Sequence, residues 1–328
     1  MLGYELIARR TSIPIPKIFG FSPGINNELG YPFTLMSRTK GIQLSKLWFD
    51  RDWFTDEHRH RFFQSLAENM SQLKDITFPK IGSLQLDEDG VLGVGPVLPS
   101  RQDLLNQPER DYHSWVLSGP FVSVHAFLST IIAQRTACAP GQPHHVQLAL
   151  LRMFALSLPD LSLDDPPFVL SMPDINYQNI FITEDGRISC LVDWDGIGAV
   201  PRQAGYARYP SWITKDWDPW GHGYYFRSGT PGIISCLTFF FSNWHAARSA
   251  IDPPPIPPRE MLKGDSPAML QQFHEGYFEV YQSVDPTGAH YTRNSHVFKA
   301  IHKACTNWAR MDAILSKLSN YAFRKPVL

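Results

Sequence analysis

The 328-residue sequence lacks any block of basic residues and any excess of charge of one sign. Its 30 Lys and Arg side chains nearly balance 31 Asp and Glu side chains, which leaves a formal net charge of −1 at pH 7. Proteins that bind nucleic acids neutralise phosphates with clustered Lys and Arg, and such clusters are missing from this sequence. The charge balance therefore argues against DNA or RNA as a partner.

Long hydrophobic runs and paired cysteines are also missing. The longest strongly apolar run, residues 232–241, is about half as long as a bilayer-spanning helix. The first ten residues, MLGYELIARR, lack the apolar core of a signal peptide. The four cysteines have no CxxC or zinc-finger spacing, which predicts free thiols in a reducing compartment. We therefore expect a cytoplasmic protein without a membrane partner.

Three catalytic signatures are absent as well. No GxSxG occurs, which disfavours a serine hydrolase, and no HExxH accompanies His58 and His60, which disfavours a zinc protease. No GxGxxG occurs either, so the sequence contains no glycine-rich loop of the kind that covers nucleotide phosphates. The chemistry of this protein must be sought in other residues.

Apolar and aromatic residues, in contrast, are plentiful. They make up 43% and 13% of the chain, which predicts a buried core, and the length suits about two domains. Residue patterns predict a helix that ends near residue 10, strands at 16–22 and 31–37, and hairpins at 81–95 and 181–196. Apolar residues at helical spacing predict helices at 55–76, 111–136, 144–157, 259–284 and 293–319. The order indicates an α+β fold with a mostly helical body.

Polar side chains flank the second hairpin in a pattern suited to phosphate chemistry. Asp174 and Asn179 lie before it in LSMPDINYQNIFI, residues 170–182, and Asp193 follows its second strand. Because a hairpin brings its two ends together, we expect Asn179 and Asp193 to lie near each other. Their oxygen atoms suit Mg²⁺, which completes its shell with water and phosphate oxygens. Asp174 can face the same point and accept a proton from an attacking hydroxyl, so the pattern predicts phosphoryl transfer.

These segments carry a family resemblance. DINYQN and LVDWDG resemble the catalytic loop and metal-binding segment of aminoglycoside phosphotransferase and choline kinase-like enzymes, which are small-molecule relatives of protein kinases. The Trp in Asp193-Trp194-Asp195 is similar to that of phosphotransferase-family proteins common in fungi. RRTSIPIPKIFGF resembles the family's passage from its regulatory helix into the next strand, and YPFTLMSRTKGIQL resembles its hinge. The resemblance runs from residue 1 to about residue 215.

The resemblance implies a protein kinase-like two-lobe fold with a truncated N-lobe. Residues 1–41 would form the residual N-lobe and hinge, and residues 42–328 the helical C-lobe with the catalytic loop and metal-binding hairpin. It implies ATP and Mg²⁺ as cofactors, and a small molecule with a hydroxyl, such as an amino alcohol, as the acceptor. The implied roles are a catalytic base at Asp174, metal ligands at Asn179 and Asp193, a Lys-pairing helix acid at Glu5, and adenine contacts at Met36 and Ser37.

Two departures from the family pattern bear on activity. The first strands, the glycine-rich loop and its Lys would lie before Met1, and Lys17 does not fit the role of that Lys. Met172 stands where relatives carry a His that hydrogen-bonds the metal segment, and Met can pack there but cannot donate a hydrogen bond. Two other functions therefore stay open: a catalytically impaired, pseudokinase-like or truncated binding protein, and a metal-dependent hydrolase.

The aromatic segment SWITKDWDPWGHGYYF, residues 211–226, has two interpretations. Trp212, Trp217 and Trp220 can pack this part of the chain onto the helical body. Together with Asp216 and Asp218 they can instead form a wall that receives a cationic amine. The sequence leaves both open, because each needs the same residue types.

Overall fold

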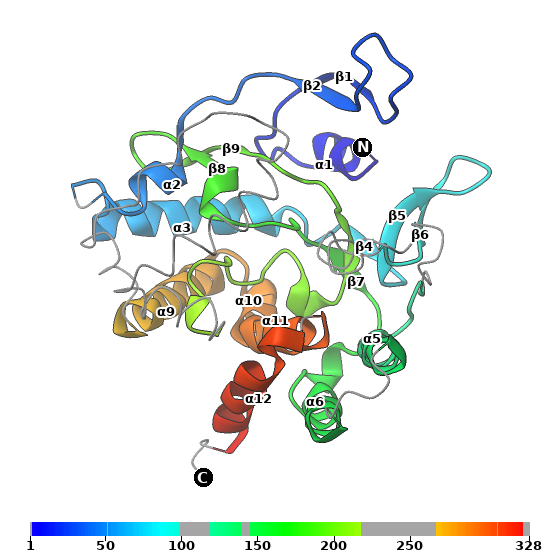
Figure 1. Ribbon diagram of the computed structural model, residues 1–328. Coiled ribbons are helices and arrows are strands. Elements are labelled where there is room, and N and C mark those ends of the chain that lie inside the picture. Colours follow the sequence, from blue (N-terminus) through cyan, green and yellow to red (C-terminus); the bar gives the residue numbers. More distant parts are fainter. Residues whose placement is uncertain are drawn as a thin grey trace, which may run out of the picture.

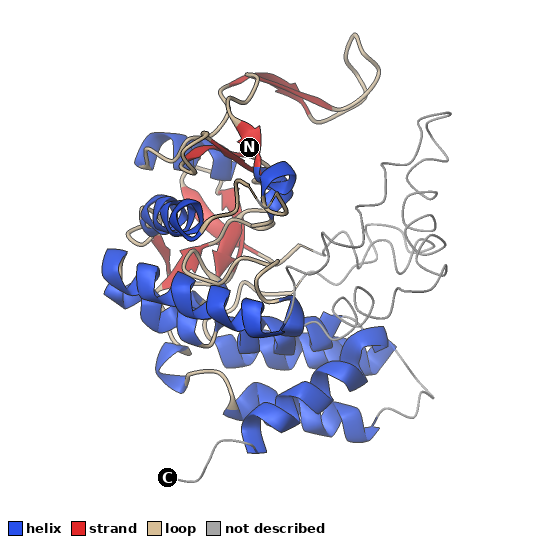
Figure 2. Cartoon of the chain, turned by 90° about the vertical axis from the view of Figure 1, so that its left-hand side faces the viewer, coloured by secondary structure: helices blue, strands red, loops and turns tan. Residues whose placement is uncertain are grey.

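The computed structural model describes residues 2–50, 52–98, 118–138, 145–217, 267–306 and 308–323. Within these ranges all strands lie before residue 201, and the part from residue 267 onward is built of helices (Figure 1). Figure 2 shows the strands gathered toward the N-terminal end and the C-terminal helices packed at the opposite end. The expected α+β class, with its mostly helical body, is confirmed.

The chain begins with helix α1 (Leu2–Arg10) and a strand pair, β1 (Ile18–Ser22) and β2 (Phe33–Met36). Pro14 and Pro16 follow α1 and prevent it from continuing, because proline lacks the donor that a helix requires. The two strands pair antiparallel as a two-stranded sheet, as the sequence predicts. Several apolar side chains of this hairpin are exposed, with Phe19, Leu35 and Phe21 at 60%, 57% and 49%.

Two further sheets lie beneath this hairpin. The first has the order β3-β8-β9, and the second has the order β4-β7-β10-β5-β6. Both predicted hairpins are present, as β5–β6 and β8–β9, and they turn at Gly90 and Gly186 with φ values of 75° and 90°. The strand bounds are β3 Ile42–Gln43, β4 Thr77–Phe78, β5 Gly82–Leu86, β6 Leu92–Gly95, β7 Phe168–Leu170, β8 Ile180–Ile182, β9 Ile188–Leu191 and β10 Gly198–Val200.

The pairing of β7 with β10 positions the segments singled out in the sequence. Leu170 and Ala199 are register partners in this antiparallel pair. Residues 171–179 leave the end of β7, and residues 192–197 enter β10 from the end of β9. The two loops are therefore held side by side by adjacent strands of one sheet.

The helices after β3 surround the sheets. Their bounds are α2 Leu44–Leu47, α3 Asp56–Ser71, α5 Val124–Cys138, α6 His145–Ser157, α9 Pro267–Val284, α10 Pro286–Arg293, α11 Ser295–Thr306 and α12 Trp308–Phe323. No helix in the described ranges is both long enough and apolar enough to span a bilayer. Cys190 and Cys305, the cysteines whose side chains are described, are buried thiols rather than a disulfide.

Two predicted helices differ from the observed ones. The helix predicted at 111–136 begins only at Val124, since residues 118–123 are not helical, and residues 111–117 lie outside the described ranges. The single helix predicted at 293–319 was wrong, because the chain forms α11 and α12, which pack against each other. Splitting the helix lets both apolar faces bury against the rest of the body, whereas one straight helix would point its second half away from it.

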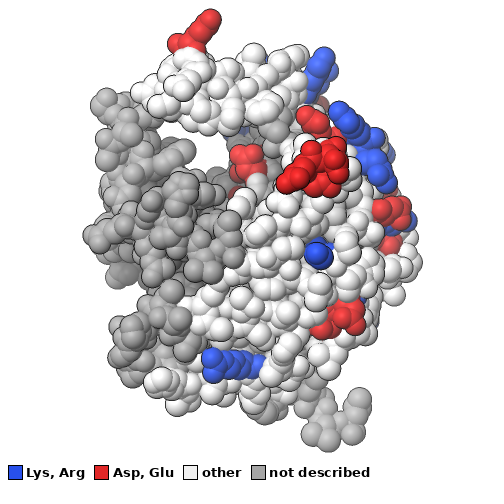
Figure 3. Space-filling view, turned by 90° about the vertical axis from the view of Figure 1, so that its right-hand side faces the viewer, with Lys and Arg blue, Asp and Glu red and all other residues white. Residues whose placement is uncertain are grey.

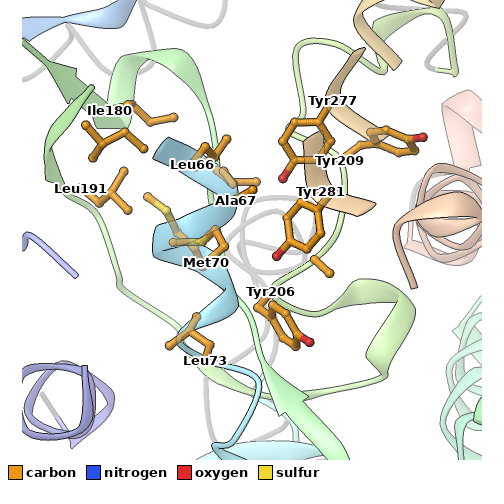
Figure 4. Packing of buried hydrophobic residues seen from close by; sticks show 14 of the residues in the cluster. Leu66, Ala67, Met70, Leu73, Ile180, Leu191, Tyr206, Tyr209, Tyr277 and Tyr281 are labelled. Carbon is orange, nitrogen blue, oxygen red and sulfur yellow. The ribbon is translucent and has the colours of Figure 1, made fainter. Parts of the chain in front are cut away.

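Helix α3 lies at the centre of the core. Thr55 caps it by accepting a hydrogen bond from the His58 amide at 3.2 Å, which satisfies one of the free amides at the helix start. Figure 4 shows Leu66 and Met70 of α3 between Ile180 and Leu191 of the β8–β9 hairpin on one side and a group of tyrosines on the other. The hairpin that leads from Asn179 to Asp193 therefore packs on the buried face of α3.

Gly3 of α1 allows this helix to approach the loop before β10. A Cβ at Gly3 would lie 1.8 Å from Ile197 Cγ2, and Gly3 itself is buried. We therefore expect Gly3→Ala to lower the free energy of unfolding by about 1–3 kcal/mol through overpacking. Gly276→Ala is the matched control, since Gly276 lies in α9 with no neighbour within 4 Å of an added Cβ. Equal unfolding midpoints of both variants in urea would contradict the close contact.

Candidate active site

The β8–β9 hairpin brings Asn179 and Asp193 to the same end. Ile180 pairs with Leu191 in this antiparallel ladder. One step beyond, the Val192 amide donates to the Asn179 carbonyl at 3.0 Å, so the pairing continues to the residue before Asp193. The structure thus brings the backbone at Asn179 next to the residue before Asp193, in keeping with the hairpin argument.

Asp174 and Asn179 are in direct contact. The Asn179 Nδ2 atom donates to Asp174 Oδ2 and to the Asp174 carbonyl, both at 3.0 Å. A one-turn helix at Tyr177–Asn179 folds the chain back between them, and the Asn176 side chain caps it by accepting from the Tyr177 amide at 2.9 Å. Since Nδ2 is directed at Asp174, the Asn179 Oδ1 atom is the acceptor that this buried amide offers to another group.

Asp193 occupies an unusual backbone conformation. Its φ of 64° is the one positive φ of a non-glycine residue in the described ranges, and such conformations gather at functional sites. The neighbouring Trp194 anchors this turn, because its buried indole Nε1 donates to the Leu191 carbonyl at 3.1 Å.

Negative charge accumulates around Asp193, which is near the carboxylates of Asp174 and Asp195. Desolvation raises the pKa of Asp193 above its ordinary value, and the charges of Asp195 and Asp174 raise it further, while a backbone hydrogen bond at Asp195 lowers it. A bound cation would relieve this repulsion. No group of three or more His, Cys, Asp and Glu side chains suited to a metal occurs in the part of the chain that is described. The donor chemistry of Asn179 and Asp193, one amide oxygen and one carboxylate, is of the kind that suits a hard cation whose shell is completed by water and phosphate.

Arg208 holds the loop before Asp174, and no sequence pattern marks it for this role. Its Nη2 atom donates to the carbonyls of Met172 and Pro173 at 2.7 and 2.6 Å. Burial lowers the pKa of Arg208 to about 10, an effect that the nearby Asp174 charge opposes, so the guanidinium stays protonated at neutral pH. Met172 is 1% exposed and packs in the core. The side chain at position 172 thus fills space, and Arg208, from 36 residues later, supplies the hydrogen bonds to the loop backbone.

The three predicted nucleotide contacts lie on the N-terminal elements. Glu5 is exposed on α1 and pairs with Arg9 of the same helix at 3.5 Å. Met36 ends β2 and is 45% exposed. The Ser37 amide donates to the Lys17 carbonyl at 2.8 Å, and its Oγ accepts from the Lys17 amide at 2.9 Å. These bonds continue the β1–β2 pairing and hold Met36 and Ser37 at the start of the connection to β3.

The aromatic segment after the β8–β9 hairpin packs into the body where it is described. Trp212 is 2% exposed and meets Trp48 edge to face, with ring centroids 5.5 Å apart. Trp217 contacts His296 at 4.5 Å between centroids, and Lys317 lies 5.1 Å above its ring. A cationic side chain of the protein itself thus already lies over the Trp217 ring. Trp220 and Asp218 lie outside the described residues.

The face of the molecule drawn in Figure 3 carries both acidic and basic side chains. Figure 3 shows acidic and basic side chains as separate small groups, without a broad basic area among the described atoms of this face. This agrees with the balanced composition of the chain. The acidic character of the site is local, at Asp174, Asp193 and Asp195.

Comparisons with known proteins place these segments in a family. The model of the APH family, the phosphotransferase enzyme family, matches residues 4–232, which include the catalytic-loop and hairpin segments. Subtelomeric hrmA-associated cluster proteins from two strains of Aspergillus fumigatus are 34% identical over 258 residues, covering 60% of this chain and 49% of theirs. The chain therefore spans about half the length of the curated relatives it matches.

The solved structures that this chain matches do so at low sequence identity. The gentamicin complex of APH(2")-IIa has a TM-score of 0.42 at 10% identity, covering 99% of this chain and 79% of that one. A structure described as that of a candidate fructosamine-3-kinase from Thermobifida fusca has a TM-score of 0.42 at 13% identity, covering 98% of this chain and 78% of that one.

Proposed function

The chain belongs to the phosphotransferase enzyme family, and from this premise we propose that it transfers the γ-phosphoryl group of ATP to a hydroxyl of a small molecule, with Mg²⁺ as cofactor. The observation that supports this proposal best is the hydrogen bond that the Asn179 side chain donates to Asp174 at 3.0 Å. Asn179 precedes the first strand of the β8–β9 hairpin, and Asp193 follows the second. In this proposal Asp174 takes a proton, and Asn179 and Asp193 hold a cation.

Asp174 acts as the base in this proposal. Its carboxylate accepts a hydrogen bond from the acceptor hydroxyl and takes the proton as the new O–P bond forms and ADP leaves. The Asn179 amide holds one carboxylate oxygen in place at 3.0 Å, and Arg208 fixes the backbone that precedes Asp174. These contacts keep the base in one orientation before the acceptor arrives, which lowers the entropic cost of the reaction.

Asn179 Oδ1 and the Asp193 carboxylate are the atoms that would hold Mg²⁺. When bound, this ion neutralises the charge of the phosphate oxygens and orients them for in-line transfer. The raised pKa of Asp193 agrees with the assignment, because burial raises it first and repulsion by Asp195 and Asp174 raises it further, and a bound cation would relieve that repulsion.

The nucleotide would lie between the N-terminal elements and the hairpin. In this proposal Met36 and Ser37 contact adenine, and Glu5 belongs to the regulatory helix. Residues 1–41 then act as the residual N-lobe and hinge, and residues 42–328 as the C-lobe. A cytoplasmic setting, where ATP is abundant and thiols stay reduced, belongs to the same proposal.

Titration with Mg-ATP tests the proposal. At 100 times its dissociation constant, a ligand that binds only the folded state adds about 2.7 kcal/mol to stability, so we expect a rise of the thermal unfolding midpoint. Removing Mg²⁺ with a chelator should reverse most of this rise. Release of ADP in the presence of acceptors then distinguishes an enzyme from a binding protein. An unchanged midpoint at millimolar Mg-ATP would contradict the proposal and favour the binding-protein or hydrolase alternatives.

A further inference from the structure

A cavity lies where strand β7 begins, whereas the loop that carries Asp174 leaves the end of that strand. The volume of the cavity is about 280 Å³, just below the roughly 300 Å³ at which pockets for drug-sized ligands begin. Pro167 lines it beside β7, and Tyr291 lines it from α10. Asp174, Asn179 and Asp193 do not line it. The cavity is therefore separate from the proposed phosphoryl-transfer site and suits a compact molecule.

Charged side chains of both signs line this cavity. They are Asp75, Asp285, Lys74 and Arg202. Among the described residues, none of the four takes part in an ion pair of 4.0 Å or less. Lys74 and Asp75 are exposed in the turn after α3, whereas Asp285 is only 5% exposed. A buried carboxylate therefore lies inside the cavity, and an exposed ammonium group lies at its mouth.

Asp285 is the buried charge that this arrangement leaves without a cation. Tyr206 donates to Asp285 Oδ2 at 3.0 Å, and Oδ1 has no hydrogen-bond partner in the described ranges. Asp285 stands at the N-cap position of α10, yet its side chain does not cap that helix. The dipole of α10 offsets part of the cost of burying this charge. The remaining cost would be relieved by a cation beside Oδ1.

Both carboxylates are close to the same hydroxyl group. Burial is the main reason why the pKa of Tyr206 is raised, and the charges of Asp285 and Asp75 raise it further. Two carboxylates beside tyrosine rings suit an ammonium group, which gains charge-assisted hydrogen bonds and cation–π contacts. Ca²⁺ takes about six to eight oxygen ligands, more than these two side chains offer. The acidic part of the cavity therefore fits an organic amine.

Lys74 and Arg202 supply the opposite charge. Arg202 Nη2 donates to the Asp165 carbonyl at 2.8 Å, and the guanidinium lies 6.0 Å from the centre of the Tyr291 ring. The ammonium group of Lys74 has no hydrogen bond or ion pair with the described part of the chain. A ligand with a single charge would meet like charges as well as opposite ones here. A ligand with both signs can place each charge beside its opposite.

We propose that this cavity binds a compact zwitterion, an amino acid whose ammonium group pairs with Asp285 and whose carboxylate pairs with Lys74. The orientation follows from burial, because the unpaired acid lies inside the cavity and the lysine at its mouth. The inference goes beyond the proposed phosphoryl transfer and does not depend on it. It gives a binding role to a buried acid that the proposed reaction does not use.

Calorimetry with unbranched amino acids tests this charge pattern on the full chain. Glycine, β-alanine, γ-aminobutyrate and 5-aminovalerate carry the same two charges at increasing separations. Each has matched probes with one charge only, which for γ-aminobutyrate are n-propylamine and butyrate. We expect at least one zwitterion to bind about 3-fold or more tightly than its amine and about 10-fold or more tightly than its acid. Binding of none of the four at about 50 mM, or equal binding of a single-charge probe, would overturn the inference.

Two variants identify the residues responsible. Asp285→Asn can still accept from Tyr206, and it should weaken binding of the zwitterion by about 10-fold because the buried charge is gone. Lys74→Gln removes an exposed charge, and it should abolish the preference for the zwitterion over its amine. Lys80→Gln is the matched control, since Lys80 is exposed and does not line the cavity. An unchanged preference in Lys74→Gln would overturn the assignment even if Asp285→Asn failed to fold.

Discussion

Replacing Asp174 by Asn is expected to lower kcat/KM for phosphoryl transfer by about 10²–10⁴-fold, the usual contribution of a general base. The new side chain can still accept the hydrogen bond from Asn179 Nδ2, so the loop should keep its shape. What it loses is the ability to take the proton from the acceptor hydroxyl. The measurement is steady-state ADP release, with Mg-ATP affinity followed separately by the thermal midpoint.

Asp185→Asn is the matched control for this experiment. Asp185 lies at the turn of the same hairpin, at the opposite end from Asn179, and its side chain is exposed. It should retain the parent rate and the parent response to Mg-ATP. Parent-like turnover by Asp174→Asn itself would show that Asp174 is not the base and would remove the central residue from the proposed mechanism.

Replacing Arg208 by Met is expected to have the second large effect. The change leaves the carbonyls of Met172 and Pro173 without the donors that they have at 2.7 and 2.6 Å. Hydrogen bonds to charged groups contribute roughly 1.5–3 kcal/mol each, so we expect the free energy of unfolding to fall by about 3 kcal/mol or more. Because these carbonyls directly precede Asp174, kcat should fall as well, even at temperatures where the variant is fully folded.

Two further variants distinguish a role of Arg208 in positioning Asp174 from a role in stability alone. Arg208→Lys restores a cation that can donate to these carbonyls, so it should recover part of kcat. Arg187→Met removes an exposed guanidinium, 73% accessible at the hairpin turn, and should change neither property. A folded Arg208→Met protein with parent kcat would mean that Arg208 contributes to stability alone.

Much of the site could be predicted from local sequence. The separation of Asp174 from Asn179 is short, and the turn between them depends on neighbouring residues such as Asn176, whose side chain caps it. The position of Asp193 followed from the hairpin, because the turn at Gly186 determines which residues pair. Strand pairs and helix caps of this kind are encoded by contiguous residues, so pattern reasoning can find them.

Other features depended on segments that are far apart in the chain. The last helix divides into α11 and α12 because each buries its own face, which the apolar spacing does not reveal. The sequence argument that Met172 cannot donate a hydrogen bond considered one position only, and the structure adds Arg208, which donates to the carbonyls of Met172 and Pro173. No local pattern marks an arginine for such a role.

The sequence by itself determined which reactive groups are present. These are Asp174 and Asn179, five residues apart, and Asp193 after the following hairpin, in a chain whose charge balance does not suit nucleic-acid binding. The tertiary structure decided how these groups are supported. Arg208 lies 36 residues after Met172 in the chain, and it reaches the carbonyls of Met172 and Pro173 only because the folded core brings the two segments together. Contacts between distant segments follow from the burial of the whole core, and no short stretch of sequence encodes that.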